Sequence, residues 1–333
     1  MRFSNKKQPK LAVIGAGVSG LTTAITLLEY GYDHVKIIAD QQHPQITSSV
    51  AAAVWVPYKV EPAIKAKKWC RDSLTKFTHL AACIDTGVSW INCIQLYRAA
   101  KVKPDWMEII ETLPLPENFP QSIYSEYKTI TNIEIPLIDT SIYMQWLMNR
   151  FIQLGGSYIA KKILHWNELQ ADADLIFNCT GLGARELVED KHLNSVSGEI
   201  IICELPEDLD YAIACDEDVN TLTYVVPRKQ SNTCIVGGSA IDDDETLEIN
   251  TENINKIWQR ALQLCPSLRT VAKKPKHFFK GYRPCRDQVR LEIDDKIYPH
   301  QKVVHNYGHG GGGFAISWGC ALEALELANS ILE

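Results

Sequence analysis

The chain has 333 residues, of which 46% are hydrophobic and 22% charged, and its formal net charge at pH 7 is −6. This composition gives no reason to expect nucleic acid or an anionic membrane as a partner. No apolar stretch reaches the roughly 18 residues that span a bilayer, and neither a secretory signal nor a peroxisomal tripeptide is visible, so we expect a cytoplasmic protein. The ten cysteines lack ligand-like spacing, which favours free thiols over disulfides or a metal site.

A glycine-rich turn follows the first predicted strand. Residues 11–14 are an apolar run with the length of one buried parallel strand, and the sequence GAGVSG comes directly after it. Gly15 permits a tight turn, Gly17 lets a diphosphate approach the backbone, and Gly20 lets the following helix pack against its own strand. The unpaired amides and the positive dipole at the start of that helix predict an anion site.

A second strand is predicted after this helix. Apolar residues recur at helical spacing up to Gly31, where a helix commonly stops. A further apolar run, residues 35–39, ends at Asp40, whose carboxylate is placed to accept hydrogen bonds from a ribose. Strand, helix and strand together predict a dinucleotide-binding unit, and a purely structural βαβ unit is the alternative.

Three later segments also bring small residues to places where a ligand could lie against the backbone. Residues 47–49 supply hydroxyl groups and residues 51–53 are alanines, for which the start of an alanine-rich helix is an equally good interpretation. Residues 175–178 are predicted to form a buried strand that leads into Cys-Thr-Gly-Leu-Gly. Residues 303–307 are predicted to form another, which leads into a glycine-rich loop at 308–313 and then a helix. The repetition predicts a long cofactor that is held at both ends.

The remaining segments predict helices and an antiparallel sheet. Residues 57–138 contain a predicted helix at 64–81, short strands and proline-rich turns, and residues 141–154 form an amphipathic helix. Strands that alternate in the antiparallel manner follow between 198 and 238. An acidic loop at 211–220 is interpreted as a solvent-facing lid, with a hairpin connection as the alternative.

The late glycine loop helps to choose between two classes of cofactor. A nicotinamide enzyme needs little beyond a phosphate turn, whereas a flavin must also have its ring system enclosed and the charge of its reduced form stabilised. A helix N-terminus aimed at the pyrimidine end of a flavin would favour the anionic reduced state. The glycine loop and the helix after it therefore favour a flavin.

Six motifs occur in the order and spacing of the D-amino-acid oxidase family, which includes D-aspartate oxidase, and the resemblance covers nearly the whole chain. They are GAGVSGL, SSVAAAVWVPY, NCTG, TYVVP, GYRPCRDQVRLE and HNYGHGGGGFAISWGCALEA. The resemblance implies an α/β fold with a Rossmann-like FAD-binding domain and a second, antiparallel-sheet α+β substrate domain. It implies residues 1–56, 139–183 and 281–333 for the first domain, and residues 57–138 and 184–280 for the second, substrate-binding and interface domain.

The resemblance also implies a reaction. A D-amino acid would be oxidised by hydride transfer to FAD, the imino acid would hydrolyse to a 2-oxo acid and ammonia, and dioxygen would become hydrogen peroxide. The implied partners are the D-amino acid and dioxygen, without nucleic acid or membrane, and a homodimer is the assembly considered. Three alternatives stay open: a D-aspartate oxidase, a flavin dehydrogenase that hands electrons to a quinone or a protein, and a FAD-binding protein without catalytic activity.

Site residues follow from the resemblance position by position. The substrate carboxylate goes to Arg283 and Tyr224, and the amino group to the carbonyl of Gly311; a planar guanidinium suits a carboxylate because it binds in bidentate fashion and keeps its proton. We name no catalytic base, and His305 and His309 are interpreted as structural histidines. The residues expected to contact FAD are Gly15, Gly17, Val18, Ser19, Gly20, Asp40, Thr47, Ser48, Ala52, Ala53, Val54, Ile163, Thr180, Gly310, Gly311, Gly313, Phe314 and Ala315.

Three positions depart from the vertebrate members of the family. Asn220 stands where they have a lid tyrosine, Val56 where they have a glutamine, and Ala315 where they have a threonine near the flavin. The last two departures predict either that the contacts pass to the backbone or that the pocket is more apolar.

The pocket for the substrate side chain is predicted to be apolar, with acidic residues 216–218 at its mouth. Its expected lining is Val54, Val56, Val226 and Phe314. D-aspartate oxidases carry further arginines, and the corresponding places here, near Cys215 and at Ser239 or Ala240, offer no positive charge. Because an unpaired buried carboxylate costs several kcal/mol, we predict a preference for neutral D-amino acids and poor use of D-aspartate. Arg228 could reverse this preference by turning into the pocket.

Overall fold

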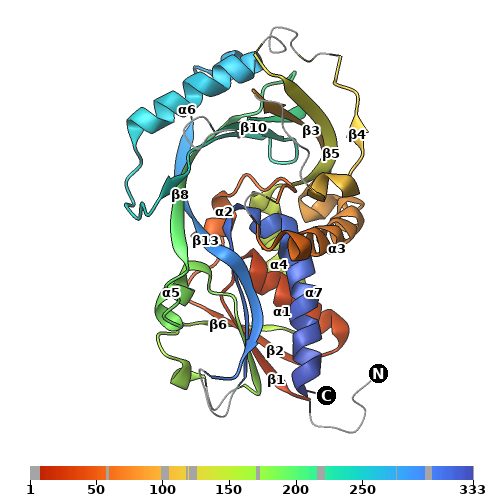
Figure 1. The fold of residues 1–333 in the computed structure, drawn as a ribbon, viewed down its shortest axis with the longest axis vertical. Coiled ribbons are helices and arrows are strands. Elements are labelled where there is room, and N and C mark those ends of the chain that lie inside the picture. The colour runs from red at the N-terminus through yellow and green to blue at the C-terminus, as the bar shows by residue number, and fades with distance from the viewer. Residues whose placement is uncertain are drawn as a thin grey trace.

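The computed structural model describes residues 8–57, 60–98, 105–117, 119, 126–169, 173–215, 222–274, 276–296 and 302–332. Within these residues the strands form one sheet of 14 strands (Figure 1). From edge to edge they are β4 (Thr112–Leu113), β5 (Thr129–Ile138), β3 (Val88–Tyr97), β9 (Tyr211–Cys215), β10 (Thr223–Arg228), β11 (Thr233–Gly237), β8 (Asn194–Glu204), β13 (His277–Asp294), β14 (Val303–His309), β7 (Leu175–Asn178), β1 (Lys10–Ile14), β2 (His34–Ala39) and β6 (Ser157–Ala160), and β12 (Ile241–Asp242) pairs with β8.

One half of the sheet is parallel. Strands β14, β7, β1, β2 and β6 pair in parallel, and residues 11–14 of β1 are an unbroken apolar run because both faces are buried, one in the main core and the other in a smaller cluster with Trp166 and Leu169. The α-helices of the described residues are α1 (Val18–Tyr30), α2 (Thr47–Val50), α3 (Ala63–Ala81), α4 (Thr140–Gln153), α5 (Ala184–Leu187), α6 (Thr251–Leu264) and α7 (Gly313–Leu332). Helix α1 packs against α4 and α7 beside this half, which confirms the Rossmann-like architecture predicted from the sequence.

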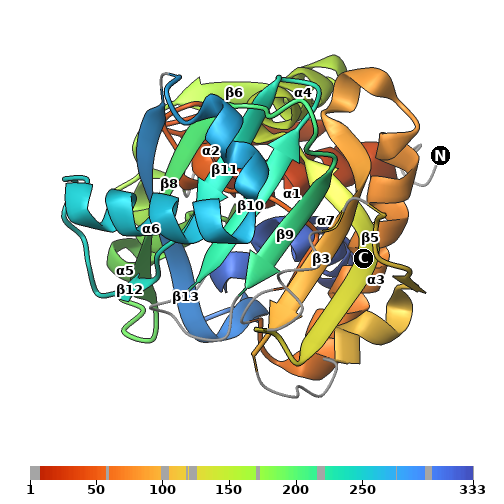
Figure 2. The same cartoon turned by 90° about the horizontal axis from the view of Figure 1, so that it is seen from above.

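The other half is mainly antiparallel, as predicted, with one parallel pair, β3 with β9. Helix α6 lies across its outer face (Figure 2) and buries Ile254, Ile257, Ala261 and Leu264 in a second hydrophobic core. Its first turn is capped by the side chain of Asn250, which accepts hydrogen bonds from two backbone amides. Strand β13 joins the halves, because it pairs with β8 at one end and with β14 at the other.

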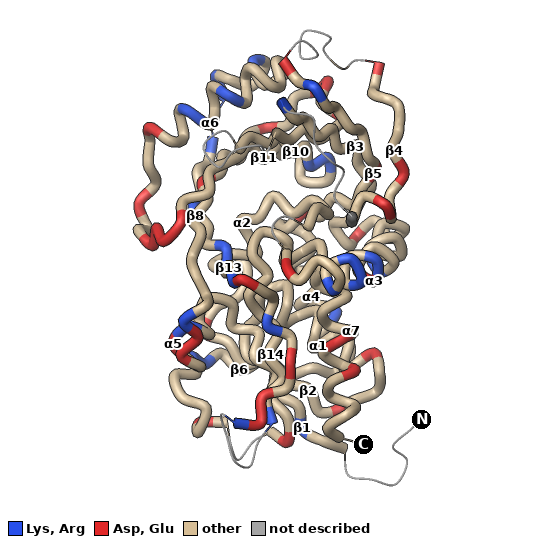
Figure 3. The backbone as a smooth tube through the Cα atoms, viewed as in Figure 1, with Lys and Arg blue, Asp and Glu red and all other residues tan. Residues whose placement is uncertain are grey.

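Acidic and basic residues are not segregated to different parts of the molecule. Lysine and arginine alternate with aspartate and glutamate along both halves of the backbone (Figure 3). Among the described residues, no helix combines the length and the apolar character that a bilayer crossing requires. All ten cysteines are free thiols, as the sequence predicted.

Three expectations need correction. The lid predicted at 211–220 is wrong for residues 211–215, which form the inner strand β9 between β3 and β10; residues 216–220 lie outside the described residues. Residues 51–53 do not start a helix, because α2 ends at Val50 and Ala51 is extended. The short strands expected within 57–138 include β3 and β5, which have ten residues each. The two-domain division stays a prediction.

Close contact between α3 and α7 yields a prediction on stability. A Cβ on Gly319 of α7 would overlap backbone atoms of Trp69 in α3, so only glycine fits there. We expect Gly319→Ala to lower the free energy of unfolding by about 1–3 kcal/mol, because the two helices would have to move apart. Urea unfolding measures this, with Ser330→Ala on the exposed face of α7 as the control. Equal stability of Gly319→Ala and the wild type would contradict the packing argument.

Candidate active site

A cavity of about 1080 Å³ is lined by residues from both halves of the sheet. Every residue that the sequence predicted to contact cofactor or substrate lines this cavity, except Gly20 and Ala315. Gly20 lies in α1, where a Cβ would overlap the carbonyl oxygen of Gly15, so it serves the packing of helix on turn. Ala315 is buried in the first turn of α7. The structure therefore brings together segments that are hundreds of residues apart in the sequence.

The turn after β1 presents bare backbone to the cavity. Gly15 has a φ of 106°, and a Cβ there would overlap the carbonyl oxygen of Cys179, so no other residue fits. Gly17 is the N-cap of α1 and offers no side chain to its amides. The amide of Val18 donates to Ser48 Oγ at 3.1 Å. The start of α1 is thus suited to a diphosphate.

The far edge of the parallel half suits an adenosine. Asp40 follows β2 directly and lines the cavity with Ile163, from the segment after β6. Two bonds hold this edge: the hydroxyl of Tyr158 donates to the carbonyl oxygen of Ala39 at 2.9 Å, and the amide of Lys161 donates to the same oxygen at 3.1 Å. Burial, together with the charge of Asp40, raises the pKa of Tyr158, which therefore keeps its proton. A carboxylate at this place can accept from ribose hydroxyls.

The third segment suited to a cofactor is the glycine loop between β14 and α7. Gly308 and Gly310 have φ values of 81° and 56°, and Gly310 opens the short 3₁₀ turn η7 (Gly310–Gly312). A Cβ on Gly308 would lie 3.0 Å from the Cβ of Arg286, so the turn rests on that side chain. Residues Gly310, Gly311, Gly313 and Phe314 line the cavity. The start of α7 therefore offers the second helix N-terminus that the sequence predicted.

His309, directly before this loop, is held by a hydrogen bond. His309 Nε2 lies 2.9 Å from Asn306 Oδ1, and the amide group of Asn306 donates to Thr23 Oγ1 at 3.0 Å. Because Asn306 Oδ1 can only accept, Nε2 of His309 carries the proton. Burial lowers the pKa of His309 to about 4, so the ring is neutral at physiological pH.

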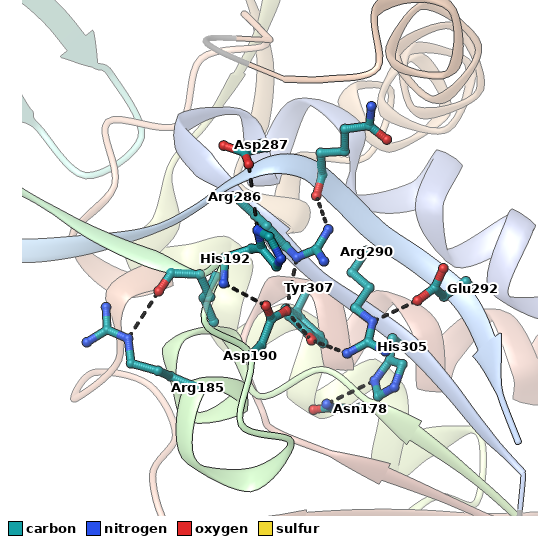
Figure 4. Close-up of polar contacts among 12 residues, drawn as sticks. Asn178, Arg185, Asp190, His192, Arg286, Asp287, Arg290, Glu292, His305 and Tyr307 are labelled. Atoms are coloured by element: carbon teal, nitrogen blue, oxygen red, sulfur yellow. Dashed lines mark hydrogen bonds and ion pairs between the residues drawn. The ribbon is translucent and has the colours of Figure 1, made fainter. Parts of the chain in front are cut away.

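A network of polar contacts surrounds Tyr307 of β14 (Figure 4). Tyr307 is its centre: its hydroxyl donates to Asp190 Oδ2 at 2.6 Å and accepts from Arg290 at 2.9 Å, while Arg286 Nε lies 2.9 Å from the same Asp190 oxygen. His305, whose pKa burial lowers to about 4, contacts Asn178 at 3.1 Å. Asn178 in turn accepts from the hydroxyl of the cavity residue Thr180 at 2.8 Å.

The substrate end of the cavity is built by β10 and β13. Arg283 lies on β13, and one of its terminal nitrogens donates to the carbonyl oxygens of Ser197 and Ser239 at 3.2 and 3.1 Å, which fixes the guanidinium plane. Tyr224 lies on β10 beside it. Burial raises the pKa of Tyr224, although the charge of Arg283 opposes this shift, so the phenol remains a donor.

Three glycines that the sequence analysis missed make room for these two side chains. A Cβ on Gly198 would lie within 2.8 Å of the Arg283 guanidinium carbon, and a Cβ on Gly237 would overlap the Tyr224 ring. Gly238 also lies against that ring. The Gly-Gly pair at the end of β11 was a visible signal in the sequence, but the reason for it is apparent only in the structure, where Gly237 pairs with Tyr224 of β10.

The walls of this end are largely apolar. Val54, Val56, Val226 and Phe314 line the cavity as predicted, and sequence reasoning missed Cys93 and Gln95 of β3. Arg228 does not point into the pocket: its guanidinium donates to the carbonyl oxygens of Ala51 at 2.7 Å and Ala52 at 3.3 Å. Asn220 and the acidic residues 216–218 lie outside the described residues.

These features fit FAD. A diphosphate turn, a ribose acceptor, a wall of small residues and a second helix N-terminus line one cavity. At its end stand a guanidinium and a phenol, which suit a carboxylate. Among the described residues, no group of histidine, cysteine and carboxylate side chains could hold a metal ion.

The chain matches the family model described as FAD dependent oxidoreductase over residues 10–327. It is 34% identical to a D-amino-acid oxidase of Streptomyces coelicolor, over 98% of this chain and 99% of that protein, and 32% identical to the human D-aspartate oxidase, over 96% and 94%. The structure resembles glycine oxidase from Bacillus cereus with a TM-score of 0.76 and 16% identity over 98% of each chain, a likeness of fold. The chain therefore belongs to the family of FAD-dependent oxidoreductases that includes the D-amino-acid oxidases and D-aspartate oxidases.

Proposed function

We propose that the protein is a D-amino-acid oxidase, which converts a D-amino acid and dioxygen into an imino acid and hydrogen peroxide; water then hydrolyses the imino acid to a 2-oxo acid and ammonia. The observation that carries this proposal is the pairing of Arg283 with Tyr224 at the end of a cavity that fits FAD. Relatives named D-amino-acid oxidase support it at 34% identity. Oxygen consumption and peroxide formation with D-alanine test it, with L-alanine as the control.

Three groups would hold the substrate. The Arg283 guanidinium binds the carboxylate with its free edge, Tyr224 adds a phenol donor, and the carbonyl of Gly311 accepts from the amino group. FAD, held by the residues that line the cavity, would supply the acceptor for the hydride from the substrate Cα and the means of passing the electrons to dioxygen. Because the amine lone pair drives the hydride from Cα, positioning by these residues replaces a catalytic base.

The described positively charged residues of the cavity leave no partner for a second substrate carboxylate, which favours substrates with a neutral side chain. Besides Arg283, the described cavity residues with positive charge are Lys161, Lys162, Arg185 and Lys280. Lys161 and Lys162 follow β6 at the adenosine edge, beside Ile163, away from the substrate end, and Lys161 pairs with Glu168. Arg185 pairs with Glu245 and Lys280 with Asp244. Arg228 is committed to backbone carbonyls. A second substrate carboxylate would therefore lack a partner, which disfavours a D-aspartate oxidase despite the human relative of that name.

A reducing, cytoplasmic location is part of the proposal. Ten free cysteines, nearly all buried, suit such a compartment. The homodimer considered from the sequence stays a prediction.

Removing the carboxylate partner should nearly abolish turnover. Arg283→Ala should lower kcat/KM by roughly 10²- to 10⁴-fold, because two charge-assisted hydrogen bonds of about 1.5–3 kcal/mol each are lost. FAD should stay bound, and Arg283→Lys should recover only part of the activity because an ammonium lacks the planar fork. Steady-state kinetics with D-alanine measure this, with the exposed Arg269→Ala as the control. Near-normal efficiency of Arg283→Ala would remove the assignment.

The pH profile separates the substrate amine from the histidine. The rate of FAD reduction should rise with pH as the substrate ammonium loses its proton. His309, with a pKa lowered to about 4 by burial, is already neutral over this range, so His309→Asn should leave the rising limb in place. Anaerobic stopped-flow measurements from pH 6 to about 10 check this. If the substitution eliminates the limb, the histidine acts as a base.

Substrate preference tests the pocket. We expect D-alanine and D-methionine to be used well, D-arginine to be tolerated in view of the predicted acidic mouth, and D-aspartate to be used orders of magnitude less efficiently, because its second carboxylate would be buried without a partner. Comparison of kcat/KM for the four amino acids decides the point. If D-aspartate were the best of them, the neutral-pocket argument would fail.

A further inference from the structure

Arg228 is a buried cation without a role in the proposed reaction. It ends β10, and its side chain is 4% exposed. Residues two apart in a strand share a face, so Arg228 lies on the same face as the cavity residues Tyr224 and Val226. Burying a guanidinium costs several kcal/mol unless its donors find partners. Its partners therefore indicate what it does.

The principal partners of Arg228 are two backbone carbonyls. One terminal nitrogen donates to Ala51 O at 2.7 Å and to Ala52 O at 3.3 Å. Its ion pair with Asp139 is longer, at 3.7 Å, and that carboxylate also caps α4 through the amide of Ser141 at 3.2 Å. The contact between Arg228 and the Ala51 carbonyl is much shorter than the ion pair. We therefore infer that Arg228 acts mainly as a clamp on the carbonyls of residues 51 and 52.

The other carbonyls of this segment are also turned to partners. Ala53 O accepts from the amide of Ile138 at 2.9 Å, and Val54 O accepts from the amide of Val56 at 2.8 Å. The amides of Ala52, Ala53 and Val54, by contrast, donate to no described residue, and all three residues line the cavity. Ala53 holds a φ of 54°, a conformation that costs energy for a residue with a side chain. In this wall of the cavity, the carbonyl oxygens of residues 51–54 are all hydrogen-bonded, whereas the amides of residues 52–54 are left as donors.

We propose that Arg228 is a positioning residue that holds the carbonyls of Ala51 and Ala52 away from the cavity, so that the amides of residues 52–54 form a donor edge for the flavin. Donors along this edge stabilise the electron-rich, reduced ring more than the oxidised one. Arg228 thereby strengthens FAD binding and raises the midpoint potential. This inference rests on FAD as the cofactor but not on the identity of the substrate, so it can be tested even if D-amino acids are not oxidised.

The experiment uses apoprotein and added FAD. Wild type, Arg228→Met, Arg228→Lys and the control Arg150→Met are titrated with FAD while flavin fluorescence is followed, well below the melting temperature of each apoprotein. Arg150 is a matched control because it pairs with Glu29 on the surface, outside the cavity lining. The midpoint potential of each holoprotein is then measured with a reference dye.

We expect Arg228→Met to weaken FAD binding by roughly 10- to 100-fold and to lower the midpoint potential, because the clamp on two carbonyls is lost. Arg228→Lys should bind FAD with intermediate affinity, since an ammonium does not reproduce the planar fork. A lower apoprotein melting temperature with FAD affinity and potential unchanged would overturn the proposal, because the role would then be structural. If Arg228→Met does not fold, Arg228→Lys decides: wild-type affinity and potential in that variant would overturn the proposal, and a loss of both would support it.

Discussion

The parallel pairing of β7 with β1 on one side and β14 on the other determines where the site lies. Ile14 stands opposite Asn178, so β1 and β7 end at the same level, whereas β14 pairs with β7 up to His305 and continues to His309. All three strands lead into turns that line the cavity. Their three turns meet there, and each must present backbone instead of side chains. The clash that a Cβ on Gly15 would make with Cys179 shows how little space separates two of these turns. Main-chain amides and helix dipoles consequently supply most of the groups that face the cofactor.

Strand β13 connects these turns to the substrate end of the cavity. At Arg283 it pairs with Val196 of β8, and at Cys285 it reaches His309 of β14, at the start of the glycine loop. The residue expected to bind the substrate carboxylate and the loop expected to bind the amino group are therefore held by one strand. Backbone hydrogen bonds set the distance between Arg283 and the glycine loop. They thus place the reacting carbon rigidly relative to the cofactor.

Local signals were enough to predict much of this arrangement. The unit from β1 to Asp40 and the glycine loop before α7 each combine a buried strand, small residues and a helix within a short stretch, so their geometry is fixed by neighbours in the sequence. The interpretation of 211–215 as part of a lid failed because acidic neighbours outweighed an apolar run of only five residues. That strand is inside because β3 and β10 flank it, which depends on distant pairing.

Other features depend wholly on long-range contacts. Arg228 could be seen at the end of a strand, but its partner Ala51 is 177 residues away, so its commitment to that carbonyl was invisible. The same holds for Gly198 and Gly237, which are needed only because Arg283 and Tyr224 come from other strands. The family resemblance supplied the roles of Arg283 and Tyr224; physical reasoning from the residues explains why a guanidinium and a phenol suit them.

A D-amino acid that enters this cavity should reduce the FAD bound there. Anaerobic mixing of the yellow holoprotein with D-alanine, followed by its visible spectrum, tests this most directly, with L-alanine in a parallel sample. We expect the D-enantiomer alone to bleach the flavin absorbance and the colour to return when air is admitted. A flavin that stays oxidised with a panel of neutral D-amino acids, or that is bleached equally by the L-enantiomers, would contradict it.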